Sequence, residues 1–341
     1  MIPRRILALM HEDLVPPETL DGYTDEQIAE WKTEYDVVTG LRQLGHKVRA
    51  LGVRDDLGVM RQAIEEFKPH IAFNMLEEFH GVALYDQHVV SYLELMRKPY
   101  TGCNPRGLTL AHDKGLSKKL LTYHRIPTPR FAVFPIGRRG RKPERLQYPL
   151  IVKSLIEHSS MGISQASVVH SDDKLAERVN FIHDHVGTDA IAEQYYDGRE
   201  LYLAIIGNRI LTTFPIWEMQ FPNLPDGAPR IATAKVKWNE KYQKRIGLTI
   251  GPAEKLPDGI AERIARLGKR AYRLLGLTGY ARLDWRLTPD GRIFLLEANP
   301  NPELAYDEEF ASAAAHAGMD FEALLQKIVS LGIRYRAQWR G

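Results

Sequence analysis

The segment 279–302 constrains the fold of this chain more than any other, because it predicts two strands joined by a tight turn. We assign the turn to Thr288-Pro-Asp-Gly291, since proline fixes φ and both aspartate and glycine tolerate the remaining turn conformations. A turn of two or four residues then sets the register of the hairpin, with Asp284 opposite Leu295 and Arg282 opposite Glu297.

Because side chains alternate between the two faces of a strand, the hairpin gathers an unusual polar group on one face. The group holds two carboxylates, an amide and a guanidinium: Asp284, Glu297, Asn299 and Arg282. Mg²⁺ binds carboxylates together with phosphate oxygens, and the arginine is expected to face the phosphates rather than the metal. The alternative is a solvated hairpin face with a cross-strand Arg–Glu pair. The neighbouring apolar run Ile293–Leu296 indicates a partly buried strand, where unpaired carboxylates are costly, and this favours the metal site.

The composition is that of a globular protein with two or three compact units. The chain has 341 residues, 44% hydrophobic and 26% charged, with a net charge of +3. No long run of one sign occurs, so we expect no nucleic acid partner. The single cysteine, Cys103, excludes an internal disulfide and is typical of a cytoplasmic protein. The first apolar run, Ile6–Met10, is too short for a signal peptide or a membrane span, so we expect a first strand there and no membrane partner.

Residues 1–103 alternate between strand and helix patterns, as in a parallel sheet covered by helices. The predicted strands are 6–10, 48–51 and 71–73, and the predicted helices are 24–44, 60–67 and 85–96. Ligands of such sheets bind at the carboxyl ends of the strands, so the loop after Phe73 is a candidate substrate loop. It contains Glu78 and His80; the alternative for both is an ordinary solvated loop.

The middle of the chain carries the signals of a phosphate site. A predicted helix at 111–124 contains Lys114, and the predicted strand Tyr148–Lys153 ends in a second lysine. The loop Ser159-Ser160-Met-Gly162 follows, and its backbone N–H groups and hydroxyls can surround a phosphate. Such a loop is also typical of a plain turn, but a lysine shortly before it favours phosphate.

Two further strands, 190–196 and 200–206, place Glu193 and Glu200 on either side of a short turn. Beyond them, the sequence predicts a strand at 210–216 and helices at 260–274, 310–316 and 321–331.

Together these motifs, in this order, resemble those of the ATP-grasp ligases and, within them, the D-alanine–D-alanine ligases. The resemblance runs from about Ile71 to the end of the chain. It rests on these motifs: Pro99–Gly102 with His112-Asp-Lys114; Tyr148–Lys153 with Glu157-x-Ser-Ser-x-Gly162; Ala192–Leu201; Asn239–Tyr242; and Arg282-Leu-Asp284 with Glu297-Ala-Asn299. It implies an α/β chain with α+β subdomains, in which an ATP-grasp fold follows an N-terminal Rossmann-like (pre-ATP-grasp) domain. The implied units are 1–103, a central lid subdomain at 104–205, and a C-terminal subdomain with the metal site at 206–341.

The resemblance also implies ATP and Mg²⁺ (or Mn²⁺) as cofactors and assigns a role to each motif. The ATP contacts are Lys114, Lys153, Ser159, Ser160 and Gly162 at the phosphates, Glu193 and the Tyr196 backbone at the adenine, and Glu200 at the ribose. Lys241 is expected to reach the γ-phosphate, Arg282 to stabilise the intermediate, and Asp284, Glu297 and Asn299 to hold the metal. The expected substrate contacts are Glu78, His80, Tyr242 and Glu303.

The activity implied by the resemblance is the joining of a small-molecule carboxylate to an amine through an acyl phosphate made with ATP. An acyl phosphate hydrolyses in water, so a closing segment is needed, and 222–244 is our candidate. The family also suggests a homodimer formed through the first domain.

Two substrate loops depart from the family pattern. The first strand runs into His11–Pro17 instead of a glycine-rich loop with serine and glutamate. After Asn299 the chain reads Pro300–Leu304 and then Asp307-Glu-Glu309, where the family has a carboxylate-binding loop. We therefore hypothesise an amine substrate other than alanine that is cationic or lacks a nearby free carboxylate. The alternatives are a genuine D-alanine–D-alanine ligase, an ATP-grasp kinase that stops after phosphoryl transfer, and a nucleotide-binding regulator without catalysis.

Overall fold

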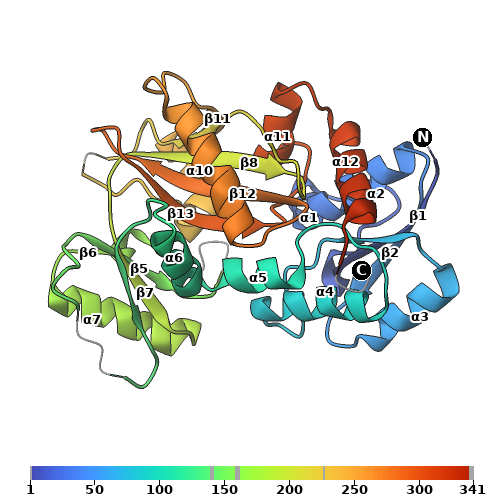
Figure 1. Cartoon of the computed structure of the whole chain (residues 1–341), viewed down its shortest axis with the longest axis horizontal. Coiled ribbons are helices and arrows are strands. Elements are labelled where there is room, and N and C mark those ends of the chain that lie inside the picture. Colours follow the sequence, from blue (N-terminus) through green and yellow to red (C-terminus); the bar gives the residue numbers. More distant parts are fainter. Residues whose placement is uncertain (1, 139–141, 158–161, 226, 338–341) are drawn as a thin grey trace.

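The computed structural model describes residues 2–138, 142–157, 162–225 and 227–337, and their strands form three sheets (Figure 1). The N-terminal sheet is parallel with the order β2-β1-β3. Its elements are β1 (Arg5–His11), α1 (Asp25–Glu30), α2 (Lys32–Gln43), β2 (Lys47–Val53), α3 (Gly58–Phe67), β3 (Ile71–Asn74) and α4 (Asp86–Leu95). The predicted parallel α/β order is confirmed, but the single helix expected at 24–44 is divided at Trp31.

The two ends of the chain share one hydrophobic core, because α11 (Glu309–His316) and α12 (Phe321–Arg334) pack beside the N-terminal sheet (Figure 1). Leu325, Ile328 and Val329 of α12 lie in the same buried cluster as Val37 and Phe73. A Cβ atom on Gly40 of α2 would lie 2.7 Å from Leu325 Cδ1, so a larger residue there would require the Leu325 side chain to shift.

The second sheet is antiparallel with the order β4-β7-β5-β6 and has α7 on one side. Its elements are β4 (Phe131–Phe134), β5 (Leu150–Ser154), β6 (Val168–Val169), α7 (Asp172–Phe181) and β7 (Ala190–Gln194). After Phe181 the helix continues as a π-helical segment, Ile182–Val186, and Gly187 ends it with a φ of 74°.

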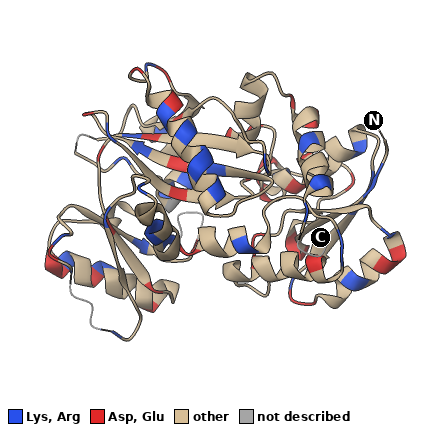
Figure 2. Cartoon of the chain, in the orientation of Figure 1, with Lys and Arg blue, Asp and Glu red and all other residues tan. Residues whose placement is uncertain are grey.

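The third sheet has the order β11-β10-β8-β12-β13, and β9 pairs with β8 outside this path. Its strands are β8 (Arg199–Ile206), β9 (Thr212–Thr213), β10 (Trp217–Gln220), β11 (Thr249–Pro252), β12 (Tyr280–Leu287) and β13 (Ile293–Pro300). The helix α10 (Ile260–Leu274) packs on β8 through Gly268, and its exposed arginines are Arg263, Arg266, Arg270 and Arg273 (Figure 2).

One strand prediction in this region needs correction, and one predicted domain boundary falls inside a strand. The strand expected at 210–216 is wrong except for Thr212–Thr213, because Pro215 has no N–H to donate to a ladder. The boundary expected at 205 falls within β8, a strand that pairs with β10 and β12 of the third sheet. The division of the chain into three domains stays a prediction.

The hairpin β12–β13 forms as predicted, with a different register. Gly291 N–H donates to Thr288 O (2.9 Å), which closes the expected turn. Trp285 lies opposite Leu295, which is one position from the predicted register. A bulge between Asp284 and Trp285 shifts the pairing by one more, so Asp284 lies opposite Glu297 and Arg282 opposite Asn299. The bulge adds Leu296 to one strand, and turn chemistry alone does not specify such an insertion.

Along the chain, α5 (Pro105–His112) and α6 (Lys114–Tyr123) lie between the first and second sheets, and α8 (Ala234–Trp238) and α9 (Glu240–Ile246) lie between β10 and β11 of the third sheet. The helix expected at 111–124 begins at Lys114, because Asp113 caps it by accepting a hydrogen bond from Leu116 N–H (2.8 Å). No helix among the described residues is long and apolar enough to cross a membrane.

Candidate active site

Three buried lysines and one buried glutamate meet where α6, β5 and β7 come together, and we call them the lysine cluster: Lys114, Lys118, Lys153 and Glu193. Lys118 and Lys153 each lie 3.0 Å from a carboxylate oxygen of Glu193, which is 1% exposed. Glu193 is opposite Ile151 in the ladder between β5 and β7, so the sheet fixes its position beside Lys153. The cluster therefore stands on regular secondary structure.

The lysines differ in how fully their N–H donors are used. Lys118 also donates to Leu296 O (2.7 Å) and Thr128 Oγ1 (3.2 Å), so its three donors are occupied. By contrast, the described residues give Lys114 one hydrogen-bond acceptor, Glu157 O (2.6 Å), and Lys153 one ion-pair partner, Glu193. Lys114 and Lys153 thus keep donors for an anion.

The pKa values in the cluster follow from burial and from the neighbouring charges. Burial lowers the pKa of Lys114 to about 8, although Glu297 attracts its charge. Burial also opposes the charge of Lys153, but Glu193 and Glu297 outweigh it and raise the Lys153 pKa above its usual value. Burial would raise the Glu193 pKa, yet Lys118 and Lys153 hold it below its usual range. The Lys153–Glu193 ion pair is therefore charged at neutral pH, whereas burial lowers the pKa of Lys118 below its usual value.

Two features of this cluster add to the sequence analysis. The Glu193 carboxylate, which we expect to border the adenine, is paired with two lysines, and its place at the adenine stays a prediction. Lys118 was missed, although it follows Lys114 by four positions and such residues share one face of a helix. The same spacing rule would have found it.

Tyr196 and Glu200, the other predicted nucleotide contacts, have their own partners. The Tyr196 ring stacks on Phe294 with centroids 4.0 Å apart. Glu200 accepts from Arg286 Nη2 (2.8 Å) and from Tyr202 Oη (3.2 Å). Arg286 was missed in the sequence, although it continues the alternation of Arg282 and Asp284 along β12.

The predicted polar group of the hairpin comes together on one face. Arg282 donates to both carboxylate oxygens of Asp284, from Nε (2.8 Å) and Nη2 (3.1 Å). Asn299 Nδ2 donates to Asp284 Oδ2 (3.0 Å), and Arg282 Nη1 lies 3.5 Å from Glu309. Arg282 thus contacts two carboxylates, Asp284 and Glu309, and its expected role at the phosphates stays a prediction.

The donor set of this face suits a hard divalent cation. Burial raises the pKa of Asp284 to about 6 despite the arginine, and the nearby Glu297 adds to the rise. A buried carboxylate with a raised pKa lacks positive charge, which Mg²⁺ would supply. The set has two carboxylates and an amide, and in the described part of the chain no three His, Cys, Asp or Glu side chains form a metal group. Phosphate oxygens would have to complete the coordination.

The remaining predicted residues are dispersed. Glu78 lies 3.4 Å from His11, while His80 is exposed and 4.0 Å from Asp55. Lys241 and Tyr242 lie on α9, where Lys241 is exposed. Glu303 lies among carboxylates treated below. Ser159 and Ser160 lie outside the described residues, and Gly162 beside them has a φ of 70°.

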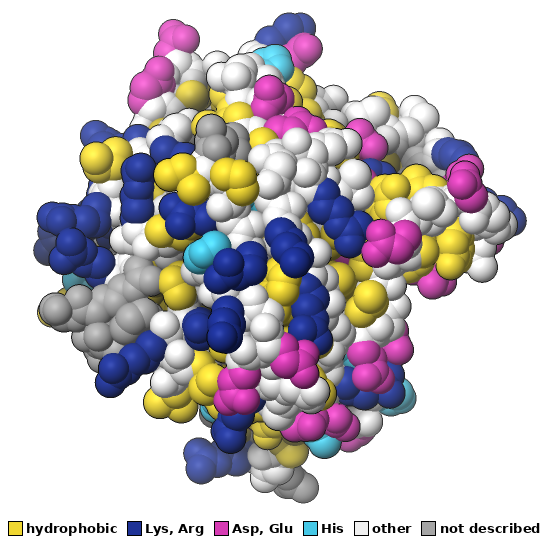
Figure 3. Space-filling view, turned by 90° about the vertical axis from the view of Figure 1, so that its right-hand side faces the viewer, with side chains coloured by type: hydrophobic (Ala, Val, Ile, Leu, Met, Phe, Trp, Pro, Cys, Tyr) yellow, Lys and Arg dark blue, Asp and Glu magenta, His cyan; other side chains and the backbone are white. Residues whose placement is uncertain are grey.

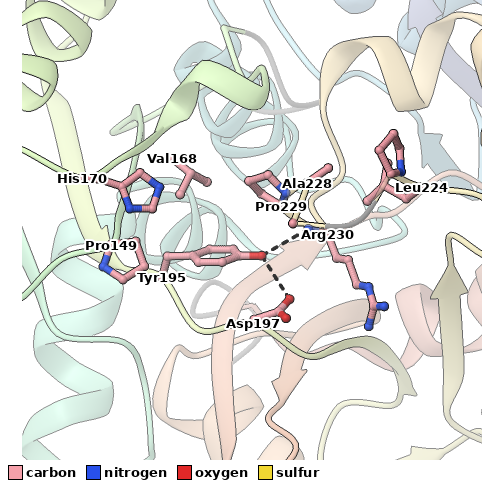
Figure 4. A pocket seen from close by; sticks show the side chains of 11 residues that line it. Pro149, Val168, His170, Tyr195, Asp197, Leu224, Ala228, Pro229 and Arg230 are labelled. Atoms are coloured by element: carbon pink, nitrogen blue, oxygen red, sulfur yellow. Dashed lines mark hydrogen bonds between the residues drawn. The ribbon is translucent and has the colours of Figure 1, made fainter.

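A separate cavity of about 240 Å³ lies between β6, β7 and the segment 224–230 (Figure 4). The Tyr195 hydroxyl there donates to Asp197 Oδ1 (3.3 Å) and accepts from Arg230 N–H (3.1 Å). None of the described residues that line it is a predicted site residue.

Comparison with known proteins agrees with this arrangement. Residues 120–330 match the family described as D-ala D-ala ligase C-terminus. The D-alanine–D-alanine ligase of Desulfotalea psychrophila is 30% identical over 276 residues, which cover 80% of this chain and 81% of that protein.

Among solved structures, the Bacillus anthracis D-alanine–D-alanine ligase complexed with ATP has a TM-score of 0.73 at 22% identity, covering 97% of this chain and 98% of that one. The VanG D-Ala:D-Ser ligase of Enterococcus faecalis has a TM-score of 0.71 at 18% identity, covering 97% of this chain and 100% of that one. These likenesses establish the fold as ATP-grasp.

The chain belongs to the D-alanine–D-alanine ligase family. It is therefore an ATP-grasp carbon–nitrogen ligase, and ATP and Mg²⁺ are the cofactors of this family.

Proposed function

We propose that this protein joins a carboxylate to an amine through an acyl phosphate, with the lysine cluster and the hairpin group as its catalytic centre. The observation that supports this most directly is their adjacency. Lys114 and Lys153 both interact electrostatically with Glu297, and Lys118 donates to Leu296 O on the same strand. A polyanion bound by the lysines would lie beside the metal-binding face.

In the first step, a carboxylate oxygen of the substrate attacks the γ-phosphorus of ATP. The bond from that phosphorus to the oxygen of the β-phosphate breaks, and ADP leaves with the bonding electrons. In the second step, the amine nitrogen attacks the acyl carbon, the carbon–oxygen bond to phosphate breaks, and the nitrogen loses a proton. Inorganic phosphate leaves and an amide remains.

The residues act by positioning and by charge stabilisation. Lys114 and Lys153 would donate to phosphate oxygens with the N–H groups that the protein leaves available. Asp284, Glu297 and Asn299 would hold Mg²⁺, which neutralises phosphate charge when bound. Tyr196 at the adenine, Glu200 at the ribose and Lys241 at the γ-phosphate stay proposals carried by the motif resemblance. The same holds for closure of the segment 222–244 over the site.

The names of the relatives favour an amino acid as one substrate. D-Alanine is named for the Desulfotalea protein, and D-alanine with D-serine for the Enterococcus protein. These two names indicate that ligases with this fold can differ in their second substrate. The amine of this enzyme is therefore a question for the carboxylate-rich loop 303–309 and for experiment.

The test is phosphate release from ATP and Mg²⁺ against pools of amino acids, diamines and short peptides, with mass spectrometry of each active pool. We expect phosphate, ADP and a product equal in mass to two components less one water. A stable phosphorylated product would identify a kinase instead. Nucleotide binding without turnover in any pool would contradict the ligase proposal for substrates of this size.

We also propose a cytoplasmic homodimer that forms through the N-terminal unit. The cytoplasmic location is supported by the single cysteine, Cys103, which is buried and unpaired. The dimer is supported by β2, which is an edge strand of its sheet. Figure 3 views the end of the molecule that this unit forms, and many Lys and Arg side chains lie on it. Light scattering after size exclusion, at low and high salt, would measure the assembly.

A further inference from the structure

Five glutamates from separate parts of the chain face one another, and we call them the carboxylate cluster: Glu34 on α2, Glu77 after β3, Glu303 after β13, and Glu308 and Glu309 at the start of α11. The two ends of the chain are held together here by Asp36, which accepts from Tyr306 N–H (3.1 Å) and from Lys32 Nζ (2.6 Å). The cluster therefore follows from the shared core of α2 and α12.

The cluster contains more carboxylates than cations. Lys237 faces Glu77, Glu303 and Glu309, and Arg282 faces Glu303, Glu308 and Glu309. Arg282 is already paired through two hydrogen bonds with Asp284. The attraction that it can give the cluster is correspondingly reduced.

Glu34 is the buried member of the cluster, and no positive charge in the described part of the chain compensates it. Its residue is 6% exposed, and its carboxylate has no side-chain partner among the described residues beyond a hydrogen bond to its own backbone. The charges that it meets are Glu77 and Glu303, both negative. A buried carboxylate in such surroundings is costly unless a proton or a cation joins it.

In the protein alone, protons meet this need. Burial and the neighbouring carboxylates raise the pKa of Glu34 to about 7. The pKa of Glu77 is raised to about 7 as well, by the surrounding protein atoms and by the charge of Glu303, although part of the residue is exposed. Burial raises the pKa of Glu308, and its hydrogen bond to Glu309 adds to the rise. A cationic ligand would replace these protons.

We propose that the carboxylate cluster binds a second, non-reacting cationic group of the amine substrate. This inference rests on the proposed ligase function, because Arg282 links the cluster to the hairpin group where the amine must react. The substrate class is a diamine, or an amino acid with a cationic side chain. An amine with only a carboxylate to present would be repelled by the five glutamates.

An organic cation fits better than a metal ion. In the described part of the chain, no group of three or more His, Cys, Asp or Glu side chains is arranged to hold a metal. The carboxylates come instead from three segments of the chain and interact electrostatically with one another. An ammonium group can take several separate acceptors, whereas Mg²⁺ demands a compact octahedral set.

The test is calorimetric binding to the full-length protein loaded with ADP and Mg²⁺, with amines matched in length. The first pair is 1,4-diaminobutane against butylamine, and the second is lysine against norleucine. We expect the member with the additional ammonium group to bind about tenfold tighter or more in at least one pair. Preference in the first pair alone indicates a diamine, and preference in the second a dibasic amino acid.

Variants then locate the effect. Glu34→Gln and Glu303→Gln keep the shape of the side chain and should each reduce the preference about tenfold. Glu262→Gln on the exposed face of α10 is the matched control and should leave it unchanged. Thermal melts confirm folding; because Glu303 is exposed, its variant tests the inference even if Glu34→Gln is unstable.

The two proposals fail in different ways. Equal binding of the amines with and without the additional ammonium group, unchanged by Glu303→Gln, would overturn the cation site and leave the ligase standing. Tight, glutamate-dependent binding of a cationic amine without any amide product in the phosphate-release assay would overturn the ligase and leave the cation site standing.

Discussion

The lysine cluster and the carboxylate cluster carry side chains of opposite charge, and both interact with the same hairpin, β12–β13. Glu297 of the hairpin interacts with Lys114, and Arg282 of the hairpin interacts with Glu309. In the lysine cluster the protein supplies an internal counter-charge, Glu193, on a central strand. In the carboxylate cluster it supplies fewer counter-charges than it has carboxylates, and Glu34 has none beside it.

The difference teaches how each group can recognise a ligand. In the lysine cluster, Lys153 and Glu193 are charged before any ligand arrives, because their ion pair raises the pKa of the lysine and lowers that of the glutamate. This cluster is preorganised for a polyanion, as ATP phosphates require. The carboxylate cluster holds protons near neutral pH, so its charge develops when a cation enters. The first is suited to a ligand shared by a family, and the second to a substrate that differs between members.

The largest effect that we predict falls on Lys153. In Lys153→Met the phosphates lose a preorganised donor, and we expect kcat/KM to fall by about 100- to 1,000-fold. Steady-state phosphate release with the substrates found above measures this. Lys119→Met, at an exposed position of α6, is the control and should behave as wild type. A loss below tenfold in Lys153→Met would show that this lysine serves the fold rather than the phosphates.

Removing Lys118 should affect stability first. This lysine joins Glu193, Leu296 O and Thr128, so Lys118→Met leaves buried acceptors without their donor. We expect the free energy of unfolding to fall by about 3 kcal/mol. Urea denaturation of the variant beside Lys119→Met measures the loss. Equal stability of the two variants would mean that Lys153 alone compensates Glu193.

Much of the lysine cluster could be predicted because its signals are local. Lys114 and Lys153 stand in motifs of a few residues, and a helix cap or the end of a strand fixes each of them. Alternation along a strand likewise brought Arg282, Asp284 and Asn299 to one face. The register was wrong by one position at the turn and by one more at a bulge, which depends on packing that no turn motif encodes.

The carboxylate cluster could be predicted only in part. The acidic run at 303–309 is visible in the sequence and suggested a cationic amine. Glu34 and Lys237 were not found, because each stands in an ordinary amphipathic or basic segment. The approach of Glu34 to the segment 303–309 depends on α12 packing against α2, a contact between residues nearly 300 positions apart. Sequence periodicity describes faces of elements and does not say which faces meet.

The smallest predicted effect is the pH dependence that Glu34 adds to stability. Its pKa is about 7 in the folded protein and near 4.5 when unfolded, so the folded state binds more protons between these values. Stability therefore falls as pH rises from 5.5 to 8, by about 2 kcal/mol for this group, or about 3 °C in Tm. Glu34→Gln removes this dependence, so the variant should gain on wild type as pH rises. Calorimetric melts at both pH values measure the gain, and Glu262→Gln should show none. Parallel curves for Glu34→Gln and wild type would mean that Glu34 is already ionised at pH 5.5. The proposed difference between the two clusters, in which the carboxylate cluster becomes charged only when a cation binds, would then be wrong.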